Sequence, residues 1–270
     1  METTFSELKG EWALVLGASS GFGAATALEL ARHGVNVFGV HLDRRATLAN
    51  VERLVADIRA QNAEAHFFNV NAADHEKRRE TIDRIEQILA GREQKKIRIL
   101  LHSLAFGALK PLVGSSTDES LSTAQIEMTL NVMASSLVYW VQDLAWRDLF
   151  AHGGRVFAMT SAGDQRCWPA YGAVSAAKAA LEAYVRQLAL ELAPRGITAN
   201  SIRAGVTDTP ASRKIPGSEV MFEEVRRRNP SGRMTTPEDV ARTIATLSLA
   251  ATGWVSGNVI GVDGGEEIVG

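Results

Sequence analysis

The sequence predicts an α/β protein with a doubly wound parallel sheet of about seven strands and helices on both faces. Short apolar runs alternate with amphipathic segments along all 270 residues. The apolar runs are mostly continuous, as expected for strands buried on both sides, and the amphipathic segments are long enough to connect parallel neighbours. This β-α alternation is typical of a three-layer α/β/α architecture.

The expected elements follow one another in a regular order. Strands are expected at residues 12–17, 35–40, 64–69, 97–102, 154–160, 196–202 and 257–262. Helices are expected near residues 22–33, 46–61, 74–90, 122–151, 171–193 and 237–250. Because the sequence has no internal repeat, low-complexity tract or flexible linker, residues 1–270 are interpreted as one domain.

One segment, residues 205–236, interrupts this order. Four of the seven prolines fall in it or directly after it, at Pro210, Pro216, Pro230 and Pro237. In doubly wound sheets, ligands bind outside the carboxyl ends of the strands, and the loops there often carry function. A long insertion after the sixth strand is therefore expected to form a substrate-covering lid.

Composition excludes several classes of protein. Hydrophobic residues make up 46% and charged residues 22%, and the net charge of −2 provides no basic field for nucleic acid. Cys167 is the only cysteine, so neither an intrachain disulfide nor a cysteine-based metal cluster is expected, and no metal site is predicted. The first ten residues lack the pattern of a secretory signal, and the apolar runs are too short to span a bilayer. A cytoplasmic protein without a membrane partner is expected.

The first expected strand leads into a glycine-rich turn and an alanine-rich helix. The turn reads Gly17, Ala18, Ser19, Ser20, Gly21, Phe22 and Gly23. Glycines allow the backbone to turn tightly and allow a pyrophosphate to approach the helix N-terminus, where free N–H groups and the helix dipole favour negative charge. The turn therefore predicts a dinucleotide site, although an ordinary tight turn would also use glycines.

The Gly-x3-Gly-x-Gly spacing resembles the short-chain dehydrogenase/reductase family, which has a Rossmann-like fold, and the resemblance covers nearly the whole chain. Further similar pieces are Asn69-Val70, Asn131, Ala204-Gly205-Val206-Thr207-Asp208-Thr209 and Val262-Asp263-Gly264-Gly265. The resemblance implies adenine contacts at Asn69 and Val70. It also implies contacts to the nicotinamide carboxamide at Gly205, Val206, Thr207 and Thr209.

The end of the second strand bears on the choice between NADPH and NADH. An acidic residue there would bind ribose hydroxyls, whereas arginine would accept a 2′-phosphate. The usual acidic position is His41, and Asp43 stands two residues later, followed by Arg44 and Arg45. Two adjacent guanidinium groups suit a phosphate dianion, and Ser19 or Ser20 could add hydroxyl groups. The sequence favours NADPH over NADH, with a solvated turn as the alternative interpretation.

The expected catalytic pair is Tyr171 and Lys178. The Tyr-x3-Lys motif of most short-chain dehydrogenases is absent, because Val174 stands four residues before Lys178. Seven residues span nearly two helical turns, so the side chains of Tyr171 and Lys178 share a helix face. Tyr-x6-Lys resembles the enoyl-acyl-carrier-protein reductases, the branch that reduces a conjugated double bond of a 2-enoyl thioester in fatty-acid biosynthesis.

A physical reason supports this spacing. In enoyl-thioester reduction, hydride adds to the β-carbon while negative charge develops on a carbonyl oxygen two carbons away. The hydrogen-bond donor must therefore reach further from the nicotinamide than in carbonyl reduction. Moving the tyrosine back by one helical turn relocates it by about 5 Å along the axis.

Roles follow from the chemistry of these groups. Lys178 would bind the nicotinamide ribose hydroxyls and favour ionisation of the Tyr171 hydroxyl. Tyr171 would hydrogen-bond the thioester oxygen and stabilise the enolate. The run His102-Ser103-Leu104-Ala105-Phe106 resembles the enoyl reductases and implies a nicotinamide wall at Ser103, Leu104 and Ala105, with His102 beside them.

Two residues point to a different reaction. Ser161, 17 residues before Lys178, and Asn131 match the catalytic serine and asparagine of the carbonyl-reducing relatives. The alternative is therefore a carbonyl reductase such as a 3-oxoacyl-acyl-carrier-protein reductase. A cofactor-binding protein without catalysis, such as a redox sensor, is a third interpretation that Tyr171 and Lys178 disfavour.

The expected partners are an acyl thioester and further copies of the chain. Basic residues near the predicted lid could steer an acidic acyl carrier protein. These residues are Arg203, Arg213, Lys214, Arg226, Arg227, Arg228 and Arg233. The helices near 122–151 and 171–193 carry more apolar surface than one sheet face needs, and the family resemblance implies a homotetramer or a homodimer.

Overall fold

The computed structural model describes residues 5–269 and contains one seven-stranded sheet. Its strands are β1 (Trp12–Leu16), β2 (Asn36–His41), β3 (Ala65–Asn69), β4 (Ile97–His102), β5 (Phe150–Ser161), β6 (Thr198–Ala204) and β7 (Val259–Val262). Their order is β3-β2-β1-β4-β5-β6-β7, and all neighbouring strands are parallel. Six of the seven lie within two residues of the predicted bounds at each end, and β5 begins four residues early.

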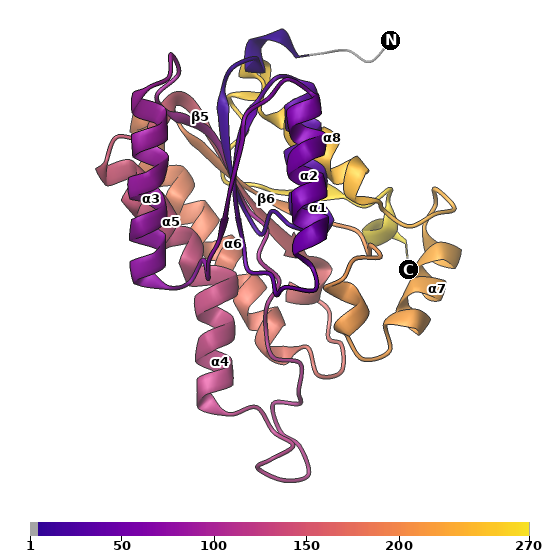
Figure 1. The fold of residues 1–270 in the computed structure, drawn as a ribbon. Coiled ribbons are helices and arrows are strands. Elements are labelled where there is room, and N and C mark those ends of the chain that lie inside the picture. The colour runs from indigo at the N-terminus through magenta and orange to yellow at the C-terminus, as the bar shows by residue number, and fades with distance from the viewer. Residues whose placement is uncertain (1–4, 270) are drawn as a thin grey trace.

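Helices cover both faces of this sheet. They are α1 (Gly21–Arg32), α2 (Leu48–Ala60), α3 (His75–Ala90), α4 (Thr123–Leu130), α5 (Ser136–Trp146), α6 (Gly172–Leu192), α7 (Ser218–Arg228) and α8 (Pro237–Leu247). One face is covered by α1, α2 and α8, and the other by α3, α5 and α6 (Figure 1). The predicted three-layer, Rossmann-like α/β fold is confirmed. No helix between residues 5 and 269 is long and apolar enough to cross a bilayer.

Strand β1 explains why the core has two halves. Its five residues are all buried, and successive side chains point to opposite faces of the sheet. Trp12, Leu14 and Leu16 pack in the core beneath α3, α5 and α6. Ala13 and Val15 pack in the other half, beneath α1 and α8. A continuous apolar run was therefore the correct signal for a strand covered on both sides.

The single helix predicted at 122–151 is wrong in detail. The chain forms α4, then a π-helical turn (Asn131–Ser135), then α5, which ends at Trp146. The hydroxyl of Ser136 donates to the carbonyl oxygen of Val132 at 2.8 Å, beside the irregular turn. Asp148 then adopts a left-handed conformation with φ 52°, which short polar residues tolerate, and the chain enters β5.

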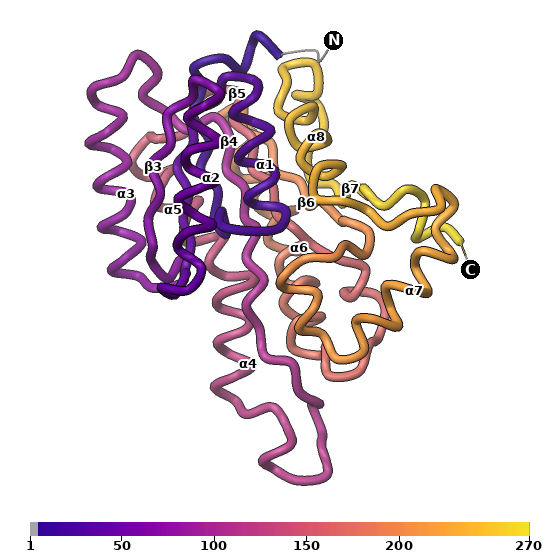
Figure 2. Tube along the Cα trace, turned by 45° about the vertical axis from the view of Figure 1, so that its right-hand side comes forward, coloured from indigo at the N-terminus to yellow at the C-terminus, as the bar shows by residue number. Residues whose placement is uncertain are grey.

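The predicted lid segment, 205–236, follows β6 at the carboxyl edge of the sheet and contains regular structure. A 3-10 turn (Ser212–Lys214) precedes α7, which stands away from the sheet (Figure 2). A second segment, residues 103–122, projects beyond the same edge and returns along α4 (Figures 1 and 2). Both segments border the edge at which ligands of doubly wound sheets bind.

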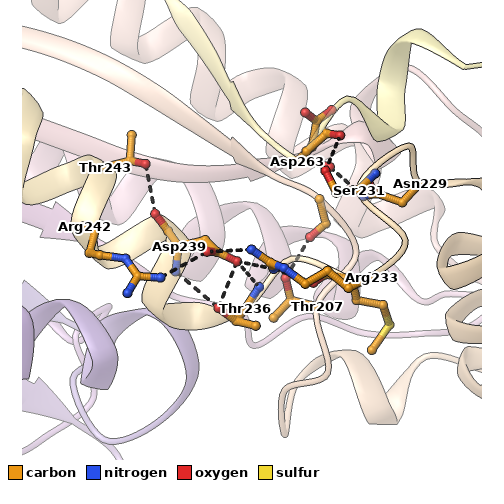
Figure 3. A network of polar contacts seen from close by, with 12 residues as sticks. Thr207, Asn229, Ser231, Arg233, Thr236, Asp239, Arg242, Thr243 and Asp263 are labelled. Carbon is orange, nitrogen blue, oxygen red and sulfur yellow. Dashed lines mark hydrogen bonds and ion pairs between the residues drawn. The ribbon is translucent and has the colours of Figure 1, made fainter.

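The far end of the lid segment is fixed to α8 and to the turn after β7 (Figure 3). The guanidinium of Arg233 donates twice to the carboxylate of Asp239, at 2.6 and 3.0 Å. Asp239 also forms a reciprocal capping box with Thr236 at the start of α8. The side-chain amide of Asn229 donates to the carbonyl oxygen of Asp263 at 2.8 Å. The return of the lid segment to the body is therefore well anchored.

Candidate active site

The glycine-rich turn between β1 and α1 is as compact as the sequence predicts. Gly17 has a φ of 87°, and its amide donates to the carbonyl oxygen of Val40 at 2.8 Å. A Cβ added at Gly23 would lie 2.9 Å from the carbonyl carbon of Gly17, so no larger residue fits without movement. Helix α1 begins at Gly21 with no side-chain cap from Ser20. Its first N–H groups therefore have no side-chain acceptor and suit a phosphate.

Two other predicted segments lie against this turn. A Cβ at Gly17 would lie 2.9 Å from the carbonyl carbon of Ser103, at the end of β4. A Cβ at Gly21 would lie 3.5 Å from Cγ2 of Thr209, which follows β6. The structure thus brings together the turn, the segment containing Ser103, Leu104 and Ala105, and the segment containing Thr207 and Thr209.

The loop after β2 places a carboxylate beside the glycine-rich turn. Nδ1 of His41 lies 3.0 Å from Oδ2 of Asp43. Burial acts to raise the pKa of Asp43, but hydrogen bonds from Thr47, Ser19 and His41 outweigh it and hold the pKa below its usual value. Asp43 is therefore an ionised group at the place where the adenosine ribose of a dinucleotide would lie.

The side chain of Asn69 is held by hydrogen bonds, whereas Arg44 and Arg45 are exposed. The Asn69 side chain accepts from the amide of Asp43 at 2.9 Å and donates to its carbonyl oxygen at 3.0 Å. Its amide group thus holds the loop after β2, a role that the predicted adenine contact did not include. Arg44 and Arg45, which follow Asp43, are exposed.

Three of the four predicted catalytic residues converge at the carboxyl end of β5. Tyr171 is the N-cap of α6, and its hydroxyl lies 3.3 Å from Oγ of Ser161. Nζ of Lys178 donates to the carbonyl oxygen of Met159 at 2.7 Å. Lys178 is only 5% exposed, so its ammonium group is held inside the site. Two further ammonium protons remain to bind hydroxyl groups of a ligand.

The titration of these groups reflects their burial. Burial lowers the pKa of Lys178 to about 8, and the charge of Glu182 opposes the shift. Burial also raises the pKa of Tyr171; the hydrogen bond with Ser161 lowers it, and the charge of Asp164 raises it further. The net direction is opposite to the lowering that the sequence analysis expected from Lys178. Tyr171 is therefore a proton-bearing donor at neutral pH.

Asn131, the fourth predicted catalytic residue, and His102, predicted beside the nicotinamide wall, form no hydrogen bond with these three side chains among residues 5–269. Asn131 is the first residue of the π-helical turn, and no hydrogen bond among residues 5–269 connects its side chain to Tyr171, Ser161 or Lys178. His102 is fully buried, with Nε2 2.8 Å from Oγ of Ser136. Burial, together with the charge of Lys178, lowers the pKa of His102 to about 3, so it is neutral. His102 supports the site from inside and presents no surface to a cofactor.

Comparison with known proteins decides the family. The profile of a protein family described as Enoyl-(Acyl carrier protein) reductase matches residues 17–267. The chain belongs to the short-chain dehydrogenase/reductase family. It is therefore an oxidoreductase of the nicotinamide-dependent type, as its glycine-rich turn and its Tyr171/Lys178 pair predicted.

The relatives of this chain include proteins named for each of the two predicted reactions, enoyl reduction and 3-oxoacyl reduction. An enoyl-[acyl-carrier-protein] reductase [NADH] from a Nostoc species is 30% identical over 97% of this chain and 98% of its own length. A 3-oxoacyl-[acyl-carrier-protein] reductase from Pseudomonas aeruginosa is 28% identical over 96% of this chain and 98% of its own. The crystal structure of an enoyl-[acyl-carrier-protein] reductase (NADH) from Aquifex aeolicus superposes with a TM-score of 0.84, at 24% identity over 97% and 98% of the two chains, which shows the shared fold.

A buried charged cluster next to the predicted catalytic pair was not predicted from the sequence. Oγ1 of Thr160 donates to Oε1 of Glu182 at 2.8 Å. Nη2 of Arg203 lies 3.5 Å from Oε1 of Glu182 and 3.5 Å from Oδ2 of Asp164. Glu182 follows Lys178 by one helical turn in an otherwise alanine-rich stretch, and that isolated acid was the available signal.

The cluster also corrects the predicted basic surface. Arg203 lies on β6 and faces the two carboxylates, so it is no part of the lid surface. Arg228 is half-buried, with Nη2 3.9 Å from Oε1 of Glu266, and Arg213 pairs with Asp208. Arg226, Arg227 and Lys214 remain exposed on or beside α7.

A second missed residue, Glu266, lies under the segment after β6. It is 2% exposed, and its Oε2 accepts from the amide of Val206 at 3.0 Å. A Cβ at Gly205 would lie 2.9 Å from the same oxygen, so the glycine is required for this contact. Glu266 therefore ties the end of the chain to the predicted carboxamide segment and, through Arg228, to α7.

Proposed function

We propose that the protein is an enoyl-thioester reductase, which adds hydride from a reduced nicotinamide cofactor to the β-carbon of a 2-enoyl thioester. The observation that carries the proposal concerns the position four residues before Lys178. Val174 there is 5% exposed and packs in an apolar cluster with Met133, so it offers no hydroxyl group. Tyr171, one turn earlier, has its hydroxyl beside Ser161 at the carboxyl edge of the sheet.

The residues support the reaction as follows. The bound cofactor supplies the hydride. The Tyr171 hydroxyl carries its proton and donates a hydrogen bond to the thioester carbonyl oxygen as negative charge develops there. The Lys178 ammonium, fixed by the Met159 carbonyl oxygen, orients the nicotinamide ribose and adds positive charge. Ser161 holds the phenol in place through its hydroxyl.

NADPH is the proposed cofactor. Arg44 and Arg45 are exposed directly after β2, where they can reach a 2′-phosphate. The ionised Asp43 favours the ribose hydroxyls of NADH instead. Comparing the Kd of NADPH and NADH in Arg44→Ala/Arg45→Ala and in Asp43→Ser separates these influences. We expect the arginine variant to lose NADPH binding selectively, and a selective loss of NADH binding would reverse the assignment.

Carbonyl reduction is the second candidate, and the contact between Ser161 and Tyr171 favours it. The two hydroxyl oxygens are 3.3 Å apart, close enough for both groups to donate to one carbonyl oxygen of a substrate. The relative from Pseudomonas aeruginosa is named for this reaction.

One experiment distinguishes the two candidates. NADPH and NADH oxidation is followed with crotonyl-CoA and, in parallel, with acetoacetyl-CoA. We expect turnover of crotonyl-CoA, with kcat reduced at least about 100-fold in Tyr171→Phe because the charge-stabilising donor is lost. Turnover of acetoacetyl-CoA alone would establish the second candidate. Turnover of neither would leave the third interpretation, a protein that binds the cofactor without catalysis.

An acyl carrier protein is the proposed carrier of the substrate. The exposed Arg226 and Arg227 on α7 lie beside the lid and suit an acidic partner. Arg226→Glu/Arg227→Glu is expected to raise KM for carrier-bound substrate about tenfold and to leave KM for the CoA analogue unchanged. Arg84→Glu, on the exposed side of α3, is the matched control. Equal effects on both substrates would exclude docking at α7.

A homotetramer is the proposed assembly. The outer sides of α5 and α6 expose large apolar residues: Trp146 is 72% exposed, Leu190 70% and Tyr184 37%. Exposed apolar groups on neighbouring helices are typical of an interface between copies. Sedimentation at micromolar concentration tests this, and a monomer would contradict it.

A further inference from the structure

The carboxyl end of β5 holds α6 through three consecutive residues. The Met159 carbonyl oxygen accepts from Lys178, the Thr160 hydroxyl donates to Glu182, and the Ser161 hydroxyl contacts Tyr171. Two of the three helix residues are the catalytic pair of the proposed reaction. The third, Glu182, has no part in that mechanism, and it is 94% buried.

A buried carboxylate at this place needs an explanation. Removing an ionised carboxyl group from water is costly unless charges and hydrogen bonds compensate. Glu182 receives a hydrogen bond from Thr160 and faces the guanidinium of Arg203, which Asp164 shares. An uncharged residue of the same size would avoid the cost, so the charge itself needs a role.

Besides Arg203, which already pairs with Glu182, the group that gains from this charge is the Lys178 ammonium. Lys178 and Glu182 are four residues apart on α6, so their side chains share one face. No ion pair within 4 Å joins them among the described residues, because Nζ of Lys178 donates to Met159 instead. Glu182 therefore acts on Lys178 through space, at a distance that leaves the ammonium protons available to a ligand.

We propose that Glu182, fixed by Thr160 and Arg203, is a positioning residue that keeps the Lys178 ammonium charged at the catalytic centre. The proposal rests on the proposed function in requiring a charged Lys178. Arg203 lies 3.5 Å from an oxygen of each of Glu182 and Asp164, so one guanidinium is shared by the two carboxyl groups. Thr160 fixes which oxygen of Glu182 faces the cluster.

The surroundings of Lys178 agree with this role. The ionisable groups that act on Lys178 directly are His102 from β4 and Glu182 from α6. Glu182 in turn faces Arg203 from β6 and Asp164 from the turn after β5, and Tyr171 precedes α6. His102 is held neutral by burial and by Lys178, and Tyr171 carries its proton. Glu182 is the group that raises the pKa of Lys178 against the effect of burial. Burial, the strongest influence, together with the charge of Asp164 and a hydrogen bond with it, raises the pKa of Glu182 above its usual value; Thr160 and Arg203 oppose this shift.

The test uses the pH dependence of kcat/KM, which reports the free enzyme. The wild type is expected to lose activity as pH rises through about 8, where Lys178 loses its proton. Glu182→Gln keeps the shape but removes the charge, so this limb should move to lower pH by about 0.5–1 unit, at the weak end of the effect of a nearby opposite charge. Activity would then fall about fivefold at pH 9 and less than twofold at pH 6.5.

A matched variant separates charge from shape. Glu182→Asp keeps the charge but shortens the side chain, and its alkaline limb should stay near that of the wild type. The proposal is overturned if Glu182→Gln leaves the limb in place, or if both variants shift it equally. Should Glu182→Gln fail to fold, Thr160→Val tests the same contact, because losing the hydroxyl donor favours the neutral form of Glu182. A smaller shift in the same direction is then expected, and no shift would count against the proposal.

A second measurement keeps this inference separate from the proposed function. Binding of NADPH or NADH, followed by the fluorescence of the reduced cofactor, depends on the Lys178 ammonium and requires no turnover. If neither thioester is reduced, the proposed function fails, yet the alkaline loss of cofactor binding still reports the charge of Lys178. The same shift to lower pH in Glu182→Gln, absent in Glu182→Asp, is expected there. If cofactor binding in Glu182→Gln shows no shift to lower pH, the proposed role of Glu182 is refuted.

Discussion

A methyl group added at Gly163 is expected to displace the Tyr171 ring and slow the chemical step without weakening cofactor binding. Gly163 lies in the 3-10 turn after β5, and a Cβ there would sit 3.0 Å from Cδ1 of Tyr171 and closer still to Cε1. Non-bonded carbon atoms pack at about 3.5–4.0 Å, so the ring must retreat by about 1 Å. A misplacement of this size near the reacting atoms costs about 100-fold, the loss in kcat that we expect for Gly163→Ala.

The assay compares kcat at saturating cofactor and substrate with the Kd of the reduced cofactor. Because Gly163 is remote from the glycine-rich turn in the chain and packs on the phenol, Kd should change less than twofold. Gly91→Ala is the matched control: its Cβ would have no neighbour closer than 3.9 Å, at the end of α3. This control should retain the kcat of the wild type.

A double-mutant cycle decides whether the loss passes through Tyr171. If Gly163→Ala acts by moving the phenol, adding it to Tyr171→Phe should cost little more than Tyr171→Phe alone. An unchanged kcat in Gly163→Ala would refute the assignment of Tyr171 as the donor. A full additional 100-fold loss in the Tyr171→Phe background would show that the methyl group acts elsewhere.

Three further predictions concern stability and are tested by urea unfolding. Arg155 is 2% exposed and donates to two carbonyl oxygens at the end of α8, so Arg155→Met should lower the free energy of unfolding by about 3 kcal/mol. The hydrogen bond from Arg233 holds the pKa of Asp239 well below its usual value. Burial opposes this shift, and hydrogen bonds from Thr236 add to it. Asp239→Asn should therefore lower the free energy of unfolding by up to about 1 kcal/mol at pH 7. The difference from the wild type should narrow as pH falls below about 3.9, the pKa of an aspartate in the unfolded chain. Ala170 has a φ of 61°, and Ala170→Gly should stabilise the fold by up to about 1 kcal/mol; a destabilised variant would contradict this.

The local signals in the sequence were strong enough to predict the sheet and much of the site. Strand β1 is a run of five apolar residues, and only a strand covered on both faces needs such a run. The glycines at 17, 21 and 23 are required by a backbone that leaves no space for a side chain or adopts positive φ. The spacing of Tyr171 and Lys178 places both on one side of α6, where Ser161 and Met159 at the end of β5 contact them.

Contacts between segments distant in the sequence could not be predicted in the same way. Arg203 was assigned to a basic surface because other arginines follow it, but β6 places it against Asp164 and Glu182. No proline or glycine marks the break in the helix at Asn131, where the chain forms a π-helical turn, so the sequence carried no signal for it. Partners of buried charges depend on strand order, which single residues do not encode.

The arrangement at β5 bears on the two reactions for which the relatives are named. Met159, Thr160 and Ser161 contact Lys178, Glu182 and Tyr171 and so fix α6 at three points. Changing which turn of α6 carries the tyrosine moves the donor by about 5 Å while Lys178 stays on its anchor. Under the proposed function, the position of one phenol would select between a carbonyl carbon and a β-carbon as the hydride acceptor. Because Val174 is buried and offers no hydroxyl group, the proposed enoyl reduction depends on the reach of Tyr171, which the crotonyl-CoA and acetoacetyl-CoA assays test.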